Sequence, residues 1–259
     1  MNEFPPDTSL VAAVDPSPNF NRRRRPLDAV VLHYTGMASA EAALARLCDP
    51  AAEVSCHYLI FEDGQIRQLV PEHERAWHAG KSYWAGETDM NSASIGIELA
   101  NGGADFGTPP FAEAQIAATI ALLGDILARR KIPAERILAH SDIAPFRKAD
   151  PGEAFPWPRL AKAGIGHYVA PVPGGDAASD IGAPALLRRG SSGAEVEELQ
   201  HRLARYGYEI AVTGRYDETT EVVIRAFQRH FRPALVDGIA DLSTRATLAA
   251  LLASLPQGA

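Results

Sequence analysis

The chain has 259 residues, of which 46% are hydrophobic and 22% are charged, a composition that predicts a soluble globular protein with two domains rather than one. Its formal net charge of −7 excludes a general electrostatic attraction to nucleic acid or to an anionic membrane surface. No apolar run approaches the length that spans a bilayer, and residues 1–20 lack the basic start and apolar core of an export signal.

The first segment is rich in proline. Residues 1–26 contain five prolines and little periodicity, so we expect an extended and poorly anchored N-terminal arm. The arm carries four consecutive arginines at positions 22–25, for which a solvated segment is a simpler interpretation than a binding patch.

Residues 27–169 alternate short apolar runs with helical patterns, which predicts one α/β domain with a central sheet and flanking helices. A helix is expected at Ser39–Leu47, and a longer one has Thr108 as its cap and Pro109 in its first turn. Its apolar stripe is Phe111, Ile116, Ile120, Leu123 and Leu127. Strands are expected at Ala29–Tyr34, His57–Glu62, Ile66–Val70 and Ser94–Ala100, with a hairpin turn at Asp63-Gly64.

Two apolar runs in this domain end in a histidine. His33 follows residues 29–32, and His140 follows residues 136–139, so both side chains are expected at the mouth of the sheet. Asp150 comes ten residues after His140. Two neutral imidazoles and one carboxylate suit a zinc ion that keeps its fourth position open for water, whereas a lone histidine in such a place is more often structural. The pattern predicts a hydrolytic zinc site.

Two further residues complete this hypothesis. Glu98 alternates with Ile95, Ile97 and Leu99, so it occupies the opposite face of its strand and is predicted to be the general base for the attacking water. Lys148 lies two positions before Asp150, where its ammonium group would stabilise a tetrahedral oxyanion. A solvent-facing glutamate and a surface lysine are the alternatives.

The other histidines and the cysteines have weaker patterns. His57 begins a strand and is expected inside the sheet, while Trp77 and His78 lie in a small-residue loop that suits the rim of a substrate cleft. His73 and His167 are expected to be exposed. Cys48 and Cys56, eight positions apart, are either buried thiols or a small disulfide, and neither belongs to a C-x-x-C metal motif.

A second unit follows a segment of Pro, Gly, Ala, Ser and Asp at residues 170–184, which is typical of an interdomain linker. Three helices are expected over residues 185–255, with just enough apolar surface for a core of their own. The first carries Val196 to Tyr206 and ends at Gly207, the second is Glu221–Phe231, and Ser243 or Thr244 caps the third.

The first domain contains five notable segments in order: Val31-Leu32-His33-Tyr34-Thr35, Ser55-Cys56-His57-Tyr58-Leu59-Ile60, Arg75-Ala76-Trp77-His78-Ala79-Gly80, Ser94-Ile95-Gly96-Ile97-Glu98 and His140 to Gly152. Together they resemble the zinc-dependent N-acetylmuramoyl-L-alanine amidases of the AmpD/AmiD type, which are relatives of phage T7 lysozyme and of peptidoglycan recognition proteins. The resemblance implies a central mixed sheet flanked by helices, zinc held by His33, His140 and Asp150, Glu98 as the catalytic acid/base, and Lys148 as the transition-state stabiliser. Some relatives have a tyrosine at the position of Cys56, so an assisting role of that tyrosine is not carried over.

Residues 185–255 resemble a three-helix peptidoglycan-binding module, through Leu187 to Gly193, Val196 to Leu203, Gly207-Tyr208, Ala226-Phe227-Gln228 and Asp237 to Asp241. A structural appendage or a dimerisation unit is the alternative.

The resemblance implies hydrolysis of the amide between N-acetylmuramic acid and L-alanine, in peptidoglycan or in muropeptides. A non-catalytic peptidoglycan sensor is the alternative from another class. The missing export signal favours a cytoplasmic recycling enzyme, whereas a wall-binding module is useful only on polymeric peptidoglycan, so the periplasm is the predicted location. The preference for anhydro or normal muramic acid, the stem-peptide specificity and the oligomeric state stay open.

Overall fold

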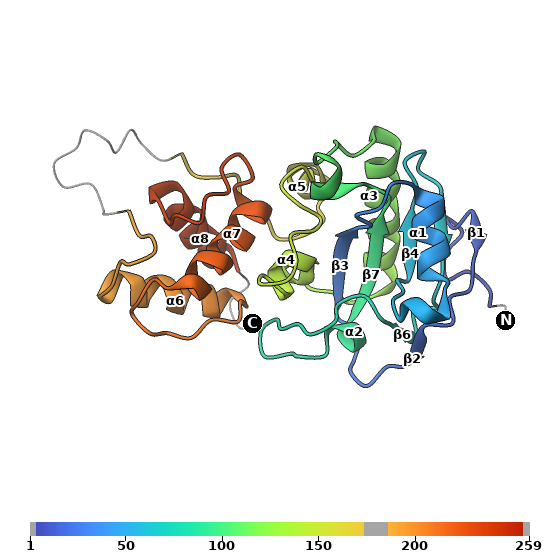
Figure 1. Ribbon diagram of the computed structural model, residues 1–259, viewed down its shortest axis with the longest axis horizontal. Coiled ribbons are helices and arrows are strands. Elements are labelled where there is room, and N and C mark those ends of the chain that lie inside the picture. Colours follow the sequence, from blue (N-terminus) through green and yellow to red (C-terminus); the bar gives the residue numbers. More distant parts are fainter. Residues whose placement is uncertain (1–3, 174–185, 256–259) are drawn as a thin grey trace.

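The computed structural model describes residues 4–173 and 186–255, which form a sheet-containing unit and a three-helix unit (Figure 1). The predicted linker lies mostly outside the described residues, since only positions 170–173 of it belong to them. These four residues run along the second unit. The Val172 N–H donates to Thr247 Oγ1 at 3.0 Å, and Ser243 Oγ donates to the Val172 carbonyl at 2.6 Å.

A six-stranded mixed sheet forms the centre of the first unit, as predicted. Its strand order is β1-β5-β4-β7-β3-β8, with β4 and β5 antiparallel and all other neighbours parallel. A separate pair, β2 and β6, is antiparallel. The strands are β1 Ala13–Val14, β2 Phe20–Arg22, β3 Ala29–Tyr34, β4 Tyr58–Ile60, β5 Ile66–Gln68, β6 Glu74–Ala76, β7 Ser94–Leu99 and β8 Ile137–Ala139.

Helices cover both faces of this sheet. Val30 and Leu32 of β3 pack with Ile116 and Leu123 of the long helix, and α1 covers Leu59 of β4 from the other side. The helices of this unit are α1 Ala40–Leu47, α2 Met90–Ala93, α3 Glu113–Arg129, α4 His140–Ile143 and α5 Trp157–Lys162, with 3-10 turns at Pro50–Ala52, Gly103–Phe106 and Ala134–Arg136.

The predicted start of the long helix is wrong. Helix α3 begins at Glu113 with Ala112 as its cap, not at Thr108. Thr108 has a φ of +53° and donates its N–H to the Gly103 carbonyl, which closes the preceding 3-10 turn. The polar cap pattern at Thr108 therefore belongs to a turn, and the helix starts only where the chain leaves it.

The prediction of a poorly anchored arm is also wrong. Strands β1 and β2 each pair with a strand of the domain, and Asp15 forms a two-bond ion pair with Arg67 at 2.7 and 2.8 Å. Ser17 Oγ donates to the Leu47 carbonyl, and the Asn19 amide bridges the carbonyls of Asp49 and Val54. The prolines thus belong to an extended edge that is fixed by hydrogen bonds.

Within the arginine run, Arg23 departs from the solvated interpretation. Its guanidinium group donates to the carbonyls of Glu72, Ser92 and Ser94, and it contacts His57 Nε2 at 2.7 Å. Burial lowers the pKa of Arg23 to about 10. One arginine of the run therefore ties the N-terminal arm to backbone carbonyls of the first unit and to His57.

The second unit has the three predicted helices, α6 Ala194–Tyr206, α7 Glu218–Phe231 and α8 Leu242–Ser254. Gly207 ends α6 as expected, but Asp241, rather than Ser243 or Thr244, caps α8 by accepting the Thr244 N–H at 2.8 Å. None of the described helices is both long and apolar enough to cross a membrane.

The apolar core of the three-helix unit continues into the first unit, which the sequence pattern did not predict. One apolar cluster joins Val223 and Phe227 of α7 to Trp84, Met90 and Leu138 of the first unit. The Trp84 ring meets the rings of Tyr206 and Tyr208 edge to face, and a Cβ on Gly207 would lie 2.6 Å from Trp84 Cε2. The two units are therefore closely packed. His167, expected to be exposed, is half-buried at this junction and hydrogen-bonds Tyr206.

Candidate active site

Strand register places three of the predicted site residues at one level. His33 of β3 pairs with Glu98 of β7, and Leu32 pairs with Ala139 of β8, so His140 follows directly beside His33. These strands are parallel neighbours, and their carboxyl ends meet at the same edge of the sheet. His33 and His140 therefore lie side by side at the mouth of the sheet, as predicted from the two apolar runs that end in histidine.

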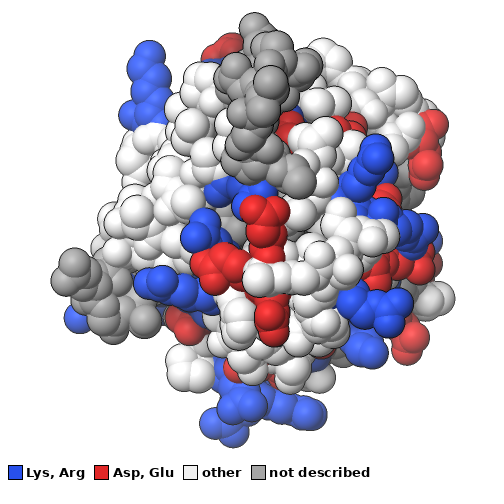
Figure 2. Space-filling model, turned by 90° about the vertical axis from the view of Figure 1, so that its left-hand side faces the viewer, with Lys and Arg blue, Asp and Glu red and all other residues white. Residues whose placement is uncertain are grey.

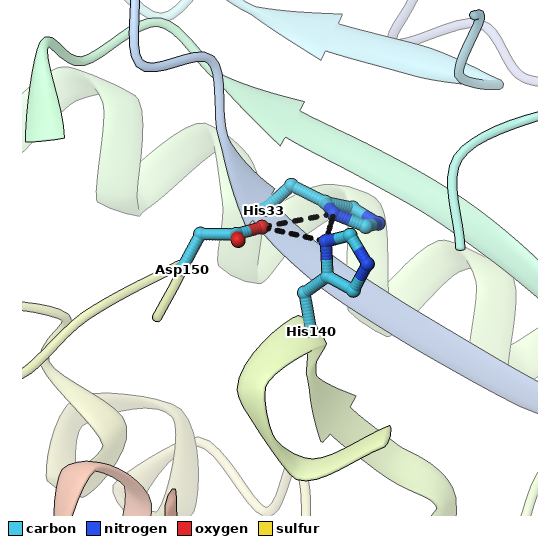
Figure 3. A group of neighbouring side chains, drawn as sticks. All are labelled: His33, His140 and Asp150. Atoms are coloured by element: carbon cyan, nitrogen blue, oxygen red, sulfur yellow. Dashed lines mark hydrogen bonds and ion pairs between the residues drawn. The ribbon is translucent and has the colours of Figure 1, made fainter. Parts of the chain in front are cut away.

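The side chains of His33, His140 and Asp150 point toward one another (Figure 3). His33 Nδ1 lies 2.9 Å from His140 Nδ1 and 3.0 Å from Asp150 Oδ2, and the third side of this triangle is 2.9 Å. All three residues are buried. Burial opposes ionisation of Asp150, but its two imidazole partners outweigh this effect and lower its pKa.

This triangle fits a metal ion. Ligand atoms about 2.0 Å from a tetrahedral ion lie about 3.3 Å apart, so displacements of a few tenths of an ångström would accommodate one. Burial, followed by the neighbouring His140, lowers the pKa of His33 to about 4, which keeps this imidazole neutral as a ligand must be. The three residues can hold a metal.

The loop after β6 orients both imidazoles from behind. His33 Nε2 lies 3.1 Å from His78 Nδ1, and His140 Nε2 lies 3.2 Å from the Ala79 carbonyl. A proton on each Nε2 satisfies both contacts and leaves each Nδ1 lone pair facing the triangle. The loop itself is fixed by Asn91 Oδ1, which accepts the N–H groups of His78 and Ala79 at 2.8 and 2.7 Å.

This arrangement changes the interpretation of the loop. His78 was predicted at the rim of a cleft. It does line the cavity that opens at the triangle, but it is only 6% exposed and it also contacts His33. Its ring occupies the space above Gly96, where a Cβ would come within 2.4 Å of His78 Cγ. The glycine between Ile95 and Ile97 therefore makes room for the supporting imidazole.

A cavity of about 510 Å³ opens at the triangle and is also lined by Glu98 and Lys148, as predicted for both. Glu98 Oε2 is buried and has no hydrogen-bond partner among the described residues. Burial raises the pKa of Glu98 well above its usual range, and Asp150 adds to this effect while Lys148 opposes it. A carboxyl group with a raised pKa in a cavity beside the candidate metal ligands is suited to general acid–base catalysis.

Comparisons with known proteins agree with this geometry. A family model described as N-acetylmuramoyl-L-alanine amidase matches residues 23–153, and a model described as a peptidoglycan binding domain matches residues 192–248. The chain belongs to the N-acetylmuramoyl-L-alanine amidase family. The predicted family and enzyme class are confirmed.

Two curated relatives illustrate the extent of this similarity. The amidase is 42% identical over 235 residues to the N-acetylmuramoyl-L-alanine amidase AmiD of Escherichia coli, covering 86% of this chain and 81% of AmiD. It is 41% identical over 129 residues to the 1,6-anhydro-N-acetylmuramyl-L-alanine amidase AmpD of Enterobacter cloacae, covering 49% of this chain and 66% of AmpD.

Solved structures extend the similarity to both units. The complex of Escherichia coli AmiD with the substrate anhydro-N-acetylmuramic acid-L-Ala-D-gamma-Glu-L-Lys superposes with a TM-score of 0.72 at 38% identity, covering 92% of this chain and 99% of that one. AmpDh3 of Pseudomonas aeruginosa gives a TM-score of 0.71 at 30% identity, with 90% and 93% covered. The predicted fold is confirmed.

Sequence reasoning missed several residues of the amidase's cavity. Tyr34, Thr35, Asp105 and Arg147 line it, whereas Trp77 is not among the described residues that do. Trp77 instead places its indole N–H 3.4 Å from Asn21 Oδ1, at the β2–β6 pair. Tyr34 and Thr35 directly follow His33 and Arg147 precedes Lys148, so the signal was adjacency to a predicted site residue.

The amidase's two cysteines are free thiols. Burial raises the pKa of Cys48 to about 11 and that of Cys56 well above its usual range. Neither sulfur is therefore an activated nucleophile at neutral pH.

Proposed function

We propose that this amidase is a zinc enzyme in which His33, His140 and Asp150 hold the ion. The donor set supports this metal, because two imidazoles and a carboxylate are the ligands of many hydrolytic zinc sites. A zinc ion held there supplies a Lewis acid that makes water nucleophilic near neutral pH and polarises the substrate carbonyl. The observation that carries the proposal is the convergence of three buried ligand atoms in a cavity that Glu98 also lines.

In the proposed reaction, Glu98 transfers the proton and Lys148 stabilises the charge that develops at the scissile amide bond. Glu98 accepts a proton from the water that attacks the lactyl carbonyl, and returns it to the amide nitrogen as the C–N bond breaks. The ammonium group of Lys148 stabilises the negative charge on the carbonyl oxygen. The products are a carboxylate on the muramic acid and a free amino group on L-alanine.

Metal analysis and product analysis together test this proposal. The purified protein should contain about one zinc per chain and should release the stem peptide from muropeptides, with the new amino group on L-alanine detected by mass spectrometry. A zinc-containing protein that binds muropeptides without cleaving them would instead support the sensor alternative.

We further propose that the substrate is polymeric peptidoglycan in the periplasm. The supporting feature is the three-helix unit that matches a peptidoglycan binding domain, since such a unit raises the local substrate concentration only on an extended polymer. Its outer face carries interspersed acidic and basic side chains rather than one sign of charge (Figure 2). Muropeptides with an anhydro sugar are the alternative substrate, because AmiD was solved with one.

Cell fractionation and sedimentation test the location and the substrate. The protein carrying Glu98→Gln is expected to sediment with purified sacculi without degrading them, and the wild-type protein is expected in the periplasmic fraction. Recovery from the cytoplasm, combined with turnover of soluble anhydromuropeptides alone, would establish the recycling alternative.

A further inference from the structure

The junction between the two units contains a fully buried carboxylate. Asp142 lies in α4, two residues after His140, and its side chain is 0% exposed. It accepts three hydrogen bonds: from the Ala139 N–H at 2.8 Å, from Tyr208 Oη at 2.7 Å, and from His230 Nδ1 at 2.7 Å. A buried carboxylate is costly unless such donors surround it.

Two of these three donors come from the C-terminal unit. Tyr208 follows α6, and His230 lies in the last turn of α7. The His230 ring is 4% exposed and stacks on Trp157 of the catalytic unit, with ring centres 3.7 Å apart. Stacking therefore fixes the plane of the His230 ring, and the hydrogen bond from Nδ1 to Asp142 Oδ2 fixes its direction.

Helix α4 needs an external anchor. It has four residues, and a single helical turn is not stable by itself. The same turn carries the predicted ligand His140, and the Ser141 N–H donates to the Asp150 carbonyl at 2.9 Å. Two of the three ligands thus depend on where this turn lies.

We propose that the C-terminal unit completes the active site, because Tyr208 and His230 position His140 and Asp150 through Asp142. This inference rests on the proposed zinc function, but it assigns a second role to a unit whose expected role is binding the wall. Asp142, Tyr208 and His230 are positioning residues, since none of them lines the described catalytic cavity. An interface that only docks the two units does not require a buried carboxylate in the turn that carries a ligand.

The test uses point variants of the full chain, because the shared core makes a deletion of the unit disruptive. Tyr208→Phe removes one hydroxyl group and keeps the ring against Trp84, and it is combined with His230→Leu. The matched control is Tyr206→Phe, which removes a hydroxyl group from the same interface, where it contacts His167 Nδ1 at 2.9 Å and not α4. His230→Asn is the rescue variant, because its amide can still donate to Asp142.

Two readouts separate positioning from wall binding. The first is zinc affinity, measured by competition with a chromophoric chelator, and the second is kcat and KM on a soluble muropeptide, which is too small to use a tether. The combined variant should lose about tenfold in zinc affinity or in kcat with little change in KM. His230→Asn in the Tyr208→Phe background should restore most of this loss, and Tyr206→Phe should match the wild type.

The proposal is overturned if the combined variant keeps wild-type zinc affinity and kcat while thermal unfolding shows a weakened interface. It is also overturned if the Tyr206→Phe control loses as much as the combined variant. If the combined variant does not fold, the zinc affinity and kcat of Tyr208→Phe alone decide whether the proposal stands, since this substitution preserves the packing. A wild-type protein that binds zinc but cleaves no muropeptide would refute the proposed function, whereas the zinc affinities would still test the positioning role.

Discussion

Gly96→Ala tests whether the loop behind the imidazoles sets the geometry of the metal site. The new Cβ would lie 2.4 Å from His78 Cγ and 2.5 Å from Cδ2, whereas an ordinary carbon contact begins at 3.4 Å. The ring must therefore move by about 1 Å. Asn91 holds the His78 backbone, and the His78 ring also contacts the rings of His33 and His57, so the side chain has little freedom to yield.

A shift of this size breaks the support of one ligand. The distance between His78 Nδ1 and His33 Nε2 would grow from 3.1 Å to about 4 Å, which is beyond a hydrogen bond. We expect zinc affinity to fall by about 10- to 100-fold, as is usual when a ligand loses its hydrogen-bonded support. Overpacking of the core should also cost about 1–3 kcal/mol of unfolding free energy.

Chelator competition gives the zinc affinity, and urea unfolding in the metal-free state gives the stability. Gly124→Ala is the matched control: a Cβ there meets nothing within 4 Å, and alanine inside α3 should stabilise the protein by up to about 1 kcal/mol. If Gly96→Ala bound zinc and turned over substrate like the wild type, His78 would have no role in orienting His33.

Three further predictions concern the ligands, the proton carrier and the fold. His33→Ala and Asp150→Ala should each lose zinc, as measured by elemental analysis after dialysis. Glu98→Gln should keep zinc and lose about 10²- to 10⁴-fold in kcat, and near-full turnover would refute its role. Glu72→Gln should cost about 3 kcal/mol, because Arg129, Arg130 and Tyr58 all donate to this buried carboxylate. Burial opposes its ionisation, but these hydrogen bonds prevail and lower the pKa of Glu72 to about 2 from 4.5. Its stabilising contribution should be present above pH 4.5 and should disappear as pH falls toward 2, and urea unfolding across this range should show a flatter dependence in the variant.

The geometry of the candidate site could be predicted largely because parallel strands bring residues from separate local patterns close together. His33 and His140 each end an apolar run, and adjacent parallel strands bring such ends together. Glu98 was found by its alternation with large aliphatic residues, which fixes the face of the strand without any knowledge of its neighbours.

What the sequence did not reveal are contacts between polar groups that lie far apart along the chain. Arg23 meets His57 34 positions away, and His78 meets His33 45 positions away, with no shared period to connect them. The loop pattern was only partly informative. It predicted Trp77 and His78 at the rim of a cleft, and His78 lines the cavity whereas Trp77 is not among the described residues that do. The pattern gave no sign that His78 also contacts His33.

The packing between the two units also depends on contacts between residues far apart along the chain. It affects how wall binding can assist catalysis. Helical periodicity correctly predicted α6, α7 and α8, but it could not tell which apolar side chains serve their own core and which meet Trp84. A unit on a free linker would raise the local substrate concentration by an amount that depends on linker length. Here α6 and α7 are packed against the catalytic unit, so any wall-binding surface on them lies at a fixed position relative to Glu98. Any increase in activity on polymeric substrate that wall binding provides must then depend on the orientation of the glycan strand. Lengthening the linker should leave this increase unchanged.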